Sequence, residues 1–256
     1  MSYLIAVSGK GGVGKTTISA LLIKQLIAGG LEPVLAIDAD PNSCLDAALG
    51  VKAVKTVGRA REEVRDEAAS AFKSGISKNE LLQLKISESL VESKGFDLIA
   101  MGRPEGPGCY CYANNVLKSV INEIAGEYPY VVLDNEAGLE NLSRRIVQKV
   151  NLLILVSDAS NSGLETLVRL YELAEEMKIG YDKLLLVVNR LRSEKLPEKA
   201  EEIKNRTKAD MVAGIPDDAE IAGFAEENKN FMELPENNKV VNKIDEIINT
   251  IIKSGD

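Results

Sequence analysis

The most specific chemistry in the chain lies near its start, in the run Gly9-Lys10-Gly11-Gly12-Val13-Gly14-Lys15-Thr16-Thr17. This pattern of glycines followed by lysine and threonine comes directly after an apolar stretch and opens a segment of helical periodicity. Glycines let the backbone curl so that several N–H groups point at one phosphate; the lysine neutralises phosphate oxygens and the threonine hydroxyl is a Mg²⁺ ligand. The run therefore predicts a nucleotide-binding loop, with contacts from Gly11, Gly12, Val13, Gly14, Lys15, Thr16 and Thr17.

Two acidic side chains, Asp38 and Asp40, follow the next apolar run of the sequence. Ligands of open α/β sheets bind at the carboxyl ends of the strands, so both carboxylates are expected beside the phosphate loop. Because the chain contains no histidine, a general base has to be a carboxylate, and Asp40 is the expected water-positioning group. The alternative is a turn in which the pair caps the following helix.

The loop contains a further lysine, Lys10, before Lys15, and this lysine makes the loop similar to that of a known family. The run from Lys10 to Thr17 resembles the deviant Walker A motif of the cell-division and partition ATPases, the nitrogenase iron protein and the arsenite-pump ATPase. In that family this lysine crosses a dimer interface and contacts the nucleotide of the other subunit, as an arginine finger does. The resemblance implies an ATPase that uses ATP/ADP and Mg²⁺, forms a homodimer, and has Lys10, Lys15 and Asp40 as catalytic residues.

The resemblance extends to two switch segments. The first is Asp38-Ala39-Asp40-Pro41-Asn42, where Asp40 would orient the attacking water, and the second is Asp134-Asn135-Glu136-Ala137-Gly138. In the family its aspartate holds Mg²⁺ through water, so Thr16, Asp38 and Asp134 are the expected magnesium residues. Family members more often have proline where Glu136 stands. Arg144 and Arg145 follow on the next predicted helix, as a partner contact or as a solvated helix face.

The base of the nucleotide is expected near Asn189, which ends an apolar run and has an amide that can pair with a purine edge. Pro216 and Asp217, after the next apolar run, resemble the family's second adenine-side segment. A simple turn-capping role for Asn189 is the alternative. The preference for ATP over GTP comes from the family resemblance.

Cys109 and Cys111 lie in a Gly/Pro-rich run, which predicts an exposed loop that carries two thiols. Two thiolates are too few for a tetrahedral metal, and no histidine completes the set. A two-fold dimer of the kind implied by Lys10 would bring four thiolates together on its axis. We therefore expect one shared site per dimer for Zn²⁺, Ni²⁺ or an iron–sulfur cluster. Cys44 is interpreted as a small core residue.

The cysteine run and the segment from Asp134 to Arg145 look like those of the CooC-type accessory ATPases. These proteins help insert nickel into the active-site cluster of carbon monoxide dehydrogenase, so the resemblance implies a metallochaperone with that enzyme as its client. It covers residues 1 to roughly 222. Two other functions stay open: a spatial regulator of the cell-division or partition type, and an iron-protein-like reductase.

Short apolar runs alternate with helix-period segments, which predicts a single-domain α/β fold with three layers and a mostly parallel sheet of seven to eight strands. The resemblance of the phosphate loop implies that this fold is of the P-loop NTPase type. Residues 1–256 are expected to form one domain. The exception is a mainly helical insertion at about 51–93, which is charged and shows no strand pattern. The strands are expected near 4–8, 33–38, 96–101, 130–134, 152–157, 183–189 and 211–215, and the best helices near 16–28, 164–178 and 239–253.

The bulk composition narrows the class of partner. A net charge of −8 disfavours nucleic acid, which selects a basic surface. No basic segment followed by a long apolar stretch opens the chain, so neither a signal peptide nor a membrane span is expected and the protein is placed in the cytoplasm. The last predicted helix has an apolar face but mixed charges, and it is expected to pack on the domain and not on a membrane.

Overall fold

The chain folds around one eight-stranded sheet, seen in a computed structural model that describes residues 2–42, 44–73, 77–102, 118, 124–139, 149–193 and 195–252. The strand order is β3-β4-β2-β5-β1-β6-β7-β8, and every neighbouring pair is parallel except β3 with β4. The strands are β1 (Tyr3–Gly9), β2 (Val34–Asp38), β3 (Val91–Glu92), β4 (Phe96–Ala100), β5 (Tyr130–Ala137), β6 (Lys149–Asp158), β7 (Gly180–Leu191) and β8 (Met211–Pro216). The predicted fold class is confirmed.

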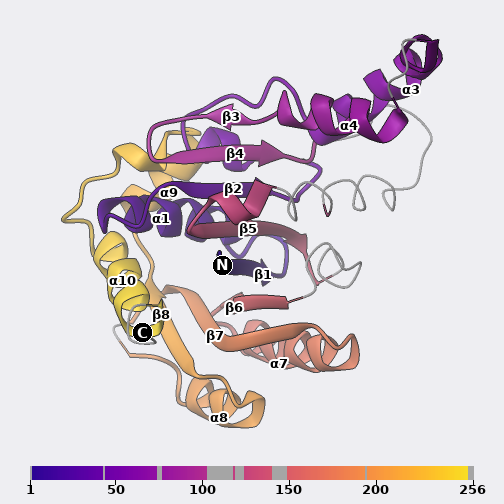
Figure 1. Ribbon diagram of the computed structural model, residues 1–256. Helices are drawn as coiled ribbons and strands as arrows, with labels where there is room; N and C mark the ends of the chain where they lie inside the picture. Colours follow the sequence, from indigo (N-terminus) through magenta and orange to yellow (C-terminus); the bar gives the residue numbers. More distant parts are fainter. Residues whose placement is uncertain are drawn as a thin grey trace.

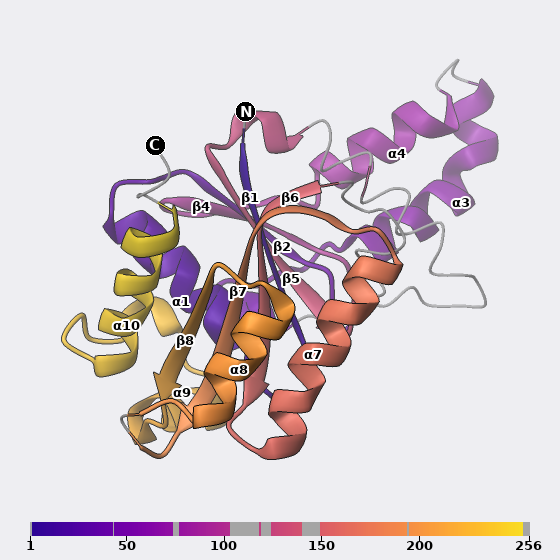
Figure 2. The same ribbon diagram turned by 90° about the horizontal axis from the view of Figure 1, so that it is seen from below.

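Helices cover both faces of this sheet and make three layers (Figure 2). One face carries α1 (Lys15–Ala28), α2 (Leu45–Ala48), α9 (Ala219–Glu226) and α10 (Lys239–Ile247). The other carries α3 (Val57–Lys73), α4 (Lys78–Ser87), α7 (Asn161–Glu176) and α8 (Glu198–Thr207). Because both faces are covered, the central strands are continuous apolar runs with side chains buried on both sides, as in residues 152–156.

The helix α1 is buried around most of its circumference because it lies between the sheet and the C-terminal helix α10 (Figure 1). Its leucines and isoleucines are nearly inaccessible to solvent, including Leu21, Ile23 and Leu26, with the exception of the partly buried Ile27 near its end. A helix held on both sides is a rigid support. The phosphate loop, which begins this helix, is therefore carried by one of the most firmly packed elements of the domain.

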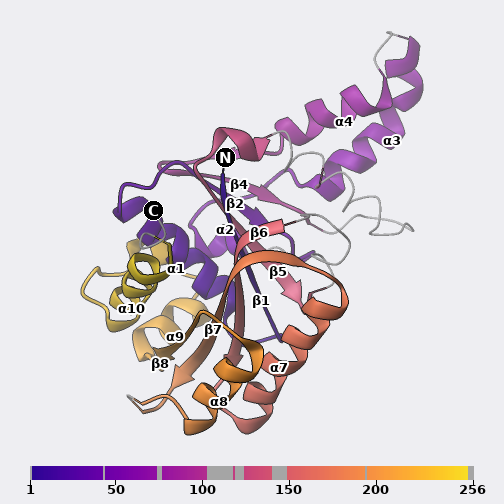
Figure 3. The same ribbon diagram turned by 60° about the horizontal axis from the view of Figure 1, so that its bottom comes forward.

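The segment expected to be a helical insertion contains α3 and α4, which pack on each other as a hairpin and extend away from the sheet (Figure 3). The helix α4 begins at Ser77 with a capping box that Glu80 completes. The segment also holds one short strand that its sequence pattern did not show, since Val91 and Glu92 form β3, antiparallel to β4. A strand of two residues is too short to show an alternating pattern.

The C-terminal helix packs on the domain, as expected. Its apolar side chains, from Val240 to Ile252, are buried against α1, β8 and their neighbours. The α-helix ends at Ile247 instead of running on regularly, and Ile248–Ile252 continue with π-helical geometry. In the described part of the chain, no helix is long and apolar enough to cross a membrane.

Candidate nucleotide-binding site

The phosphate loop joins β1 to α1 at the carboxyl edge of the sheet. Gly14 stands directly before α1 with a φ of 94°, a left-handed conformation that side chains other than glycine adopt at a cost. The Nζ of Lys15 donates a 3.3 Å hydrogen bond to the carbonyl oxygen of Lys10, so the lysine lies folded over its own loop. The loop opens into a groove of about 420 Å³, lined by Gly11, Gly12, Gly14, Lys15, Thr16, Thr17, Asp40, Asn42, Glu136, Ala137 and Arg190.

Val13 alone among the predicted loop contacts points away from this groove. Its side chain is 4% exposed and packs in the core beneath the loop. Its carbonyl oxygen accepts a 2.8 Å hydrogen bond from Nδ2 of Asn189. Val13 thus anchors the loop from below, and only its backbone is available to a nucleotide.

Asp134 lies behind the loop, almost completely buried, and accepts two hydroxyl hydrogen bonds from α1. Thr16 donates to one carboxylate oxygen at 2.7 Å and Ser19 to the other at 3.0 Å. Burial raises the pKa of Asp134 to about 6, although both hydroxyl bonds favour the ionised form. A groove-lining hydroxyl backed by a buried carboxylate is a set of hard oxygen donors that fits Mg²⁺.

Asp38 lies beside Asp134, since the two residues pair across β2 and β5. Burial, and then the charge of Asp134, raise the pKa of Asp38 to about 7. Its two oxygens accept backbone N–H bonds from Asp40 and Leu45, both at 3.0 Å. These are the bonds of the turn-capping alternative, so Asp38 organises the first switch, and its approach to Mg²⁺ stays a prediction.

Asp40 extends from that turn into the phosphate groove. One of its oxygens accepts hydrogen bonds from the backbone N–H and the side-chain amide of Asn42, at 2.8 and 2.9 Å. The turn therefore holds the carboxylate at the groove, where a water-positioning group is needed.

Cys44, a few residues further on, is not a core residue as we had expected. It is exposed at the N-terminal end of α2, and the neighbouring Leu45 fills the core instead. Helix-capping positions lie outside the packed face of a helix, which explains the difference.

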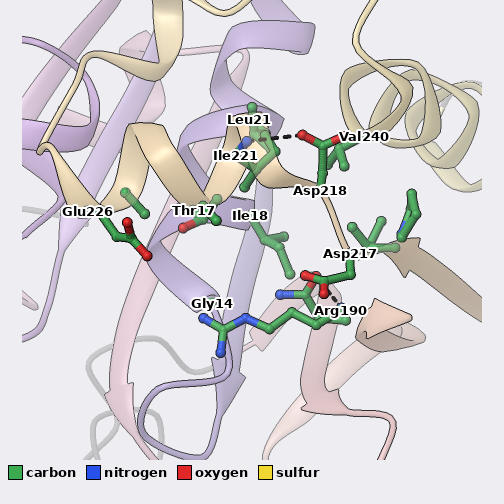
Figure 4. Close-up of a pocket in the computed structure, with 15 residues that line it drawn as sticks. Gly14, Thr17, Ile18, Leu21, Arg190, Asp217, Asp218, Ile221, Glu226 and Val240 are labelled. Atoms are coloured by element: carbon green, nitrogen blue, oxygen red, sulfur yellow. Dashed lines mark hydrogen bonds between the residues drawn. The ribbon is translucent and has the colours of Figure 1, made fainter. Parts of the chain in front are cut away.

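A second cavity, of about 350 Å³, lies between α1 and α9 and continues the phosphate groove (Figure 4). The predicted base-side residues Asn189, Pro216 and Asp217 all line it, together with Thr17 and apolar side chains of α1 and α9. Its position beyond the loop, and its walls of apolar side chains with polar groups among them, suit a purine. The amide of Asn189 is already engaged, because besides its bond to Val13 its oxygen accepts the N–H of Arg190 at 2.9 Å.

Sequence reasoning missed Arg190, which lines the phosphate groove, the purine-sized cavity and an outer cleft of about 850 Å³. Nothing in the sequence marked it, because its position depends on how β7 pairs with β8. The sequence also suggested no role for Glu136, whose exposed side chain lines the groove.

Some predicted residues are not brought into this site. The Lys10 side chain is exposed. Hydrogen bonds from Ser160 lower the pKa of Asp158 at the end of β6, and the positive charges of Lys10 and Arg190 lower it further. Cys109, Cys111, Arg144 and Arg145 lie outside the described residues. Within the described residues, no group of three or more cysteine or acidic side chains could hold a metal ion.

The phosphate loop, Asp40, Asp134 and the purine-sized cavity are arranged as the parts of a nucleotide-binding site. Comparison with known proteins points to the same kind of domain. The profile of the CobQ/CobB/MinD/ParA nucleotide-binding domain matches residues 4–231. The chain belongs to this family. An ATP-binding protein of uncharacterised function from Methanocaldococcus jannaschii is 44% identical over 257 residues, covering 97% of this chain and 98% of the relative.

Two further similarities lie within the family. The carbon monoxide dehydrogenase accessory protein CooC of Rhodospirillum rubrum is 32% identical over 230 residues, covering 85% of this chain and 84% of CooC. Among solved structures, the septum site-determining protein MinD of Pyrococcus horikoshii in complex with Mg-ADP has a TM-score of 0.69 at 22% identity, covering 100% of this chain and 98% of that one. The structural likeness establishes the fold; the CooC likeness is one of sequence.

Proposed function

We propose that this protein is an ATP-hydrolysing homodimer that acts as a metallochaperone for carbon monoxide dehydrogenase. The observation that carries the hydrolytic part is the buried Asp134 bound to the Thr16 hydroxyl beside Lys15 and Asp40, a set of residues that suits a magnesium nucleotide. The metallochaperone part rests on the likeness to CooC, which spans most of both chains, together with the cysteine pair of the sequence.

In this proposal six residues that line the groove have a defined part in hydrolysis. The backbone of Gly11, Gly12 and Gly14 and the ammonium group of Lys15 bind the phosphates, and Asp40 orients the attacking water. Thr16 and Asp134 would hold Mg²⁺, which supplies charge neutralisation on the phosphate oxygens when bound. Lys10, from the partner subunit, would add positive charge where negative charge develops in the transition state.

The cargo would be bound by Cys109 and Cys111 of both subunits, four thiolates in all. Such a site suits Ni²⁺ or Zn²⁺. Asp38 ends β2 and Asp40 follows it, while the second switch begins with Asp134 in β5, the strand that pairs with β2, so both switches lie at the same edge of the sheet. Nucleotide-dependent closure of that edge would assemble the thiolate site, and hydrolysis would open it again.

Anaerobic titration with Ni²⁺ or Zn²⁺, with and without ATP, tests this proposal when the mass of the protein is measured alongside. We expect one metal ion per dimer, tighter binding with ATP, and loss of the metal in the Cys109→Ser variant with basal hydrolysis retained. Equal metal content in wild type and Cys109→Ser contradicts the cysteine site. A visible absorption band of an iron–sulfur cluster near full occupancy, in anaerobically purified protein, contradicts the nickel role and favours a reductase.

A spatial regulator of the MinD type is the second candidate, favoured by the family and by the likeness to the MinD structure. The buried apolar face of α10 weighs against a membrane role for that helix, because those side chains are already covered by the domain. Sedimentation with liposomes in the presence of ATP separates the two candidates. Clear co-sedimentation supports the regulator, and its absence together with bound metal supports the metallochaperone.

A further inference from the structure

Arg190 lies in an irregular part of β7, where the pairing with β8 departs from regular strand geometry. Val188 pairs with Gly214 and Leu191 with Pro216, so two residues of β7 face a single residue of β8. This is a β-bulge, and Arg190 within it has a φ of 57°. Bulges re-aim side chains, and left-handed backbone at a residue other than glycine persists where the surroundings hold it in place.

The surroundings that hold it are themselves part of the nucleotide site. The side-chain oxygen of Asn189 accepts the Arg190 N–H, and its amide nitrogen donates to Val13 under the phosphate loop. One amide group thus ties the bulge to the loop. The bulge is therefore held against the loop through Asn189, and the Arg190 side chain extends from this bulge.

The guanidinium stands between the purine-sized cavity and the phosphate groove. Arg190 lines both, as do Gly14 and Thr17 at the end of the phosphate loop. In Figure 4 the side chain runs from beside Asp217 back toward Gly14. A nucleotide that places its base in the cavity and its terminal phosphates in the groove must pass its ribose and α-phosphate through this junction.

We infer that Arg190 binds the α-phosphate of the nucleotide within its own subunit. A guanidinium presents a planar fork of N–H donors that matches two phosphate oxygens, and such charge-assisted bonds are stronger than neutral ones. This inference rests on the proposed nucleotide site, but it requires neither hydrolysis nor a metal cargo. It assigns Arg190 to nucleotide binding, beside the two lysines of the loop.

Equilibrium binding of adenosine, AMP and ADP to Arg190→Ala tests the inference on the full chain. We expect the affinity for AMP and ADP to fall by about ten-fold to a hundred-fold, as for the loss of a hydrogen bond to a charged group. Adenosine, which has no phosphate, should bind as it does to the wild type. An equal loss for adenosine overturns the inference, since the arginine would then be contacting the base or the ribose.

Two further variants separate binding from folding. Arg190→Gly removes the side chain and also the left-handed strain, so it should unfold at the same temperature as the wild type or higher and still lose AMP affinity. Arg192→Ala, two residues on, removes an exposed arginine that lines only the outer cleft and should leave AMP affinity unchanged. Wild-type AMP affinity in Arg190→Gly overturns the inference. An Arg190 variant that binds AMP and ADP as the wild type does, but no longer dimerises with ATP, overturns it as well. Because the readout uses no metal, failure of the metallochaperone proposal would leave this result standing.

Discussion

The hydroxyl of Thr16 donates a 2.7 Å hydrogen bond to Asp134, which joins the first turn of α1 to β5. Ser19, on the same face of α1, donates to the other oxygen of the carboxylate at 3.0 Å. The end of the phosphate loop and the start of the second switch are therefore coupled through one buried acidic group. A change in what Thr16 binds alters the hydrogen bonding of Asp134 at the same time.

Replacing Thr16 with alanine removes the groove hydroxyl while leaving Lys15 and the loop glycines. We expect Thr16→Ala to bind ADP with an affinity that no longer depends on Mg²⁺, and to hydrolyse ATP at least about 100-fold more slowly, because metal-assisted charge neutralisation is lost. Calorimetric titration of ADP with Mg²⁺ and with EDTA measures the first effect. Thr16→Ser keeps the hydroxyl and should keep the Mg²⁺ dependence; wild-type Mg²⁺ dependence in Thr16→Ala would falsify the assignment.

Gly14 and Asn189 should show a large energetic coupling. A Cβ at Gly14 would lie 2.5 Å from Nδ2 of Asn189, and the φ of 94° disfavours any side chain there. We expect Gly14→Ala to lower the free energy of unfolding by about 2 kcal/mol or more, and Asn189→Ala by about 1 kcal/mol through the lost bond to Val13.

The double variant should be more stable than the sum of the two losses implies, because removing the amide relieves the clash. Urea denaturation of the four proteins in this cycle provides the test. Losses that add to within about 0.5 kcal/mol would show that the two residues do not touch in solution.

Much of the fold follows from local sequence patterns. The continuous apolar runs at 152–156 and 184–188 predict strands buried on both faces, and the glycine pattern before Lys15 predicts the loop. Asp38, Asp40 and Asp134 are placed correctly at one sheet edge because parallel strands end there together.

The features that were missed depend on pairing or on orientation. The role of Arg190 arises from a bulge that exists only because β7 and β8 pair with a shift in register. Cys44 is exposed because it stands at the end of a helix, a position that its residue type does not reveal. The thiolate site needs a second subunit and residues outside the described ranges, so the fold of one chain leaves it as a proposal.

The stability of the nucleotide-free protein should depend on pH through Asp38 and Asp134. Their pKa values are raised to about 7 and about 6 in the folded state, so between the ordinary value of 3.8 and these values the folded chain binds more protons than the unfolded one. The contribution of these two groups to the free energy of unfolding is therefore greatest below about pH 4, and it is lost as the pH rises toward 7. We expect a slope on the order of 1 kcal/mol per pH unit from each group within its window.

Urea denaturation in EDTA between pH 5 and 8 measures this slope. Asp38→Asn removes the group with the higher pKa, so the decline between about pH 6 and 7 should disappear even though the variant starts from a lower stability. A wild-type protein that becomes more stable as pH rises from 5 to 7 contradicts the raised values, as would an unchanged slope in Asp38→Asn.

Lys10 is the residue on which the proposed dimer depends, and its side chain can be removed without disturbing the loop. The 3.3 Å bond from Lys15 goes to the backbone oxygen of Lys10, so Lys10→Ala leaves that bond in place. We expect the variant to bind ADP as the wild type does, to remain monomeric with ATP, and to hydrolyse ATP about 1,000-fold more slowly or worse, as when an arginine finger is removed. Light scattering with ATP and a phosphate-release assay measure the two losses. Lys15→Ala is the matched comparison, since it should lose nucleotide binding itself, and wild-type hydrolysis by monomeric Lys10→Ala would show that the lysine acts on no other subunit.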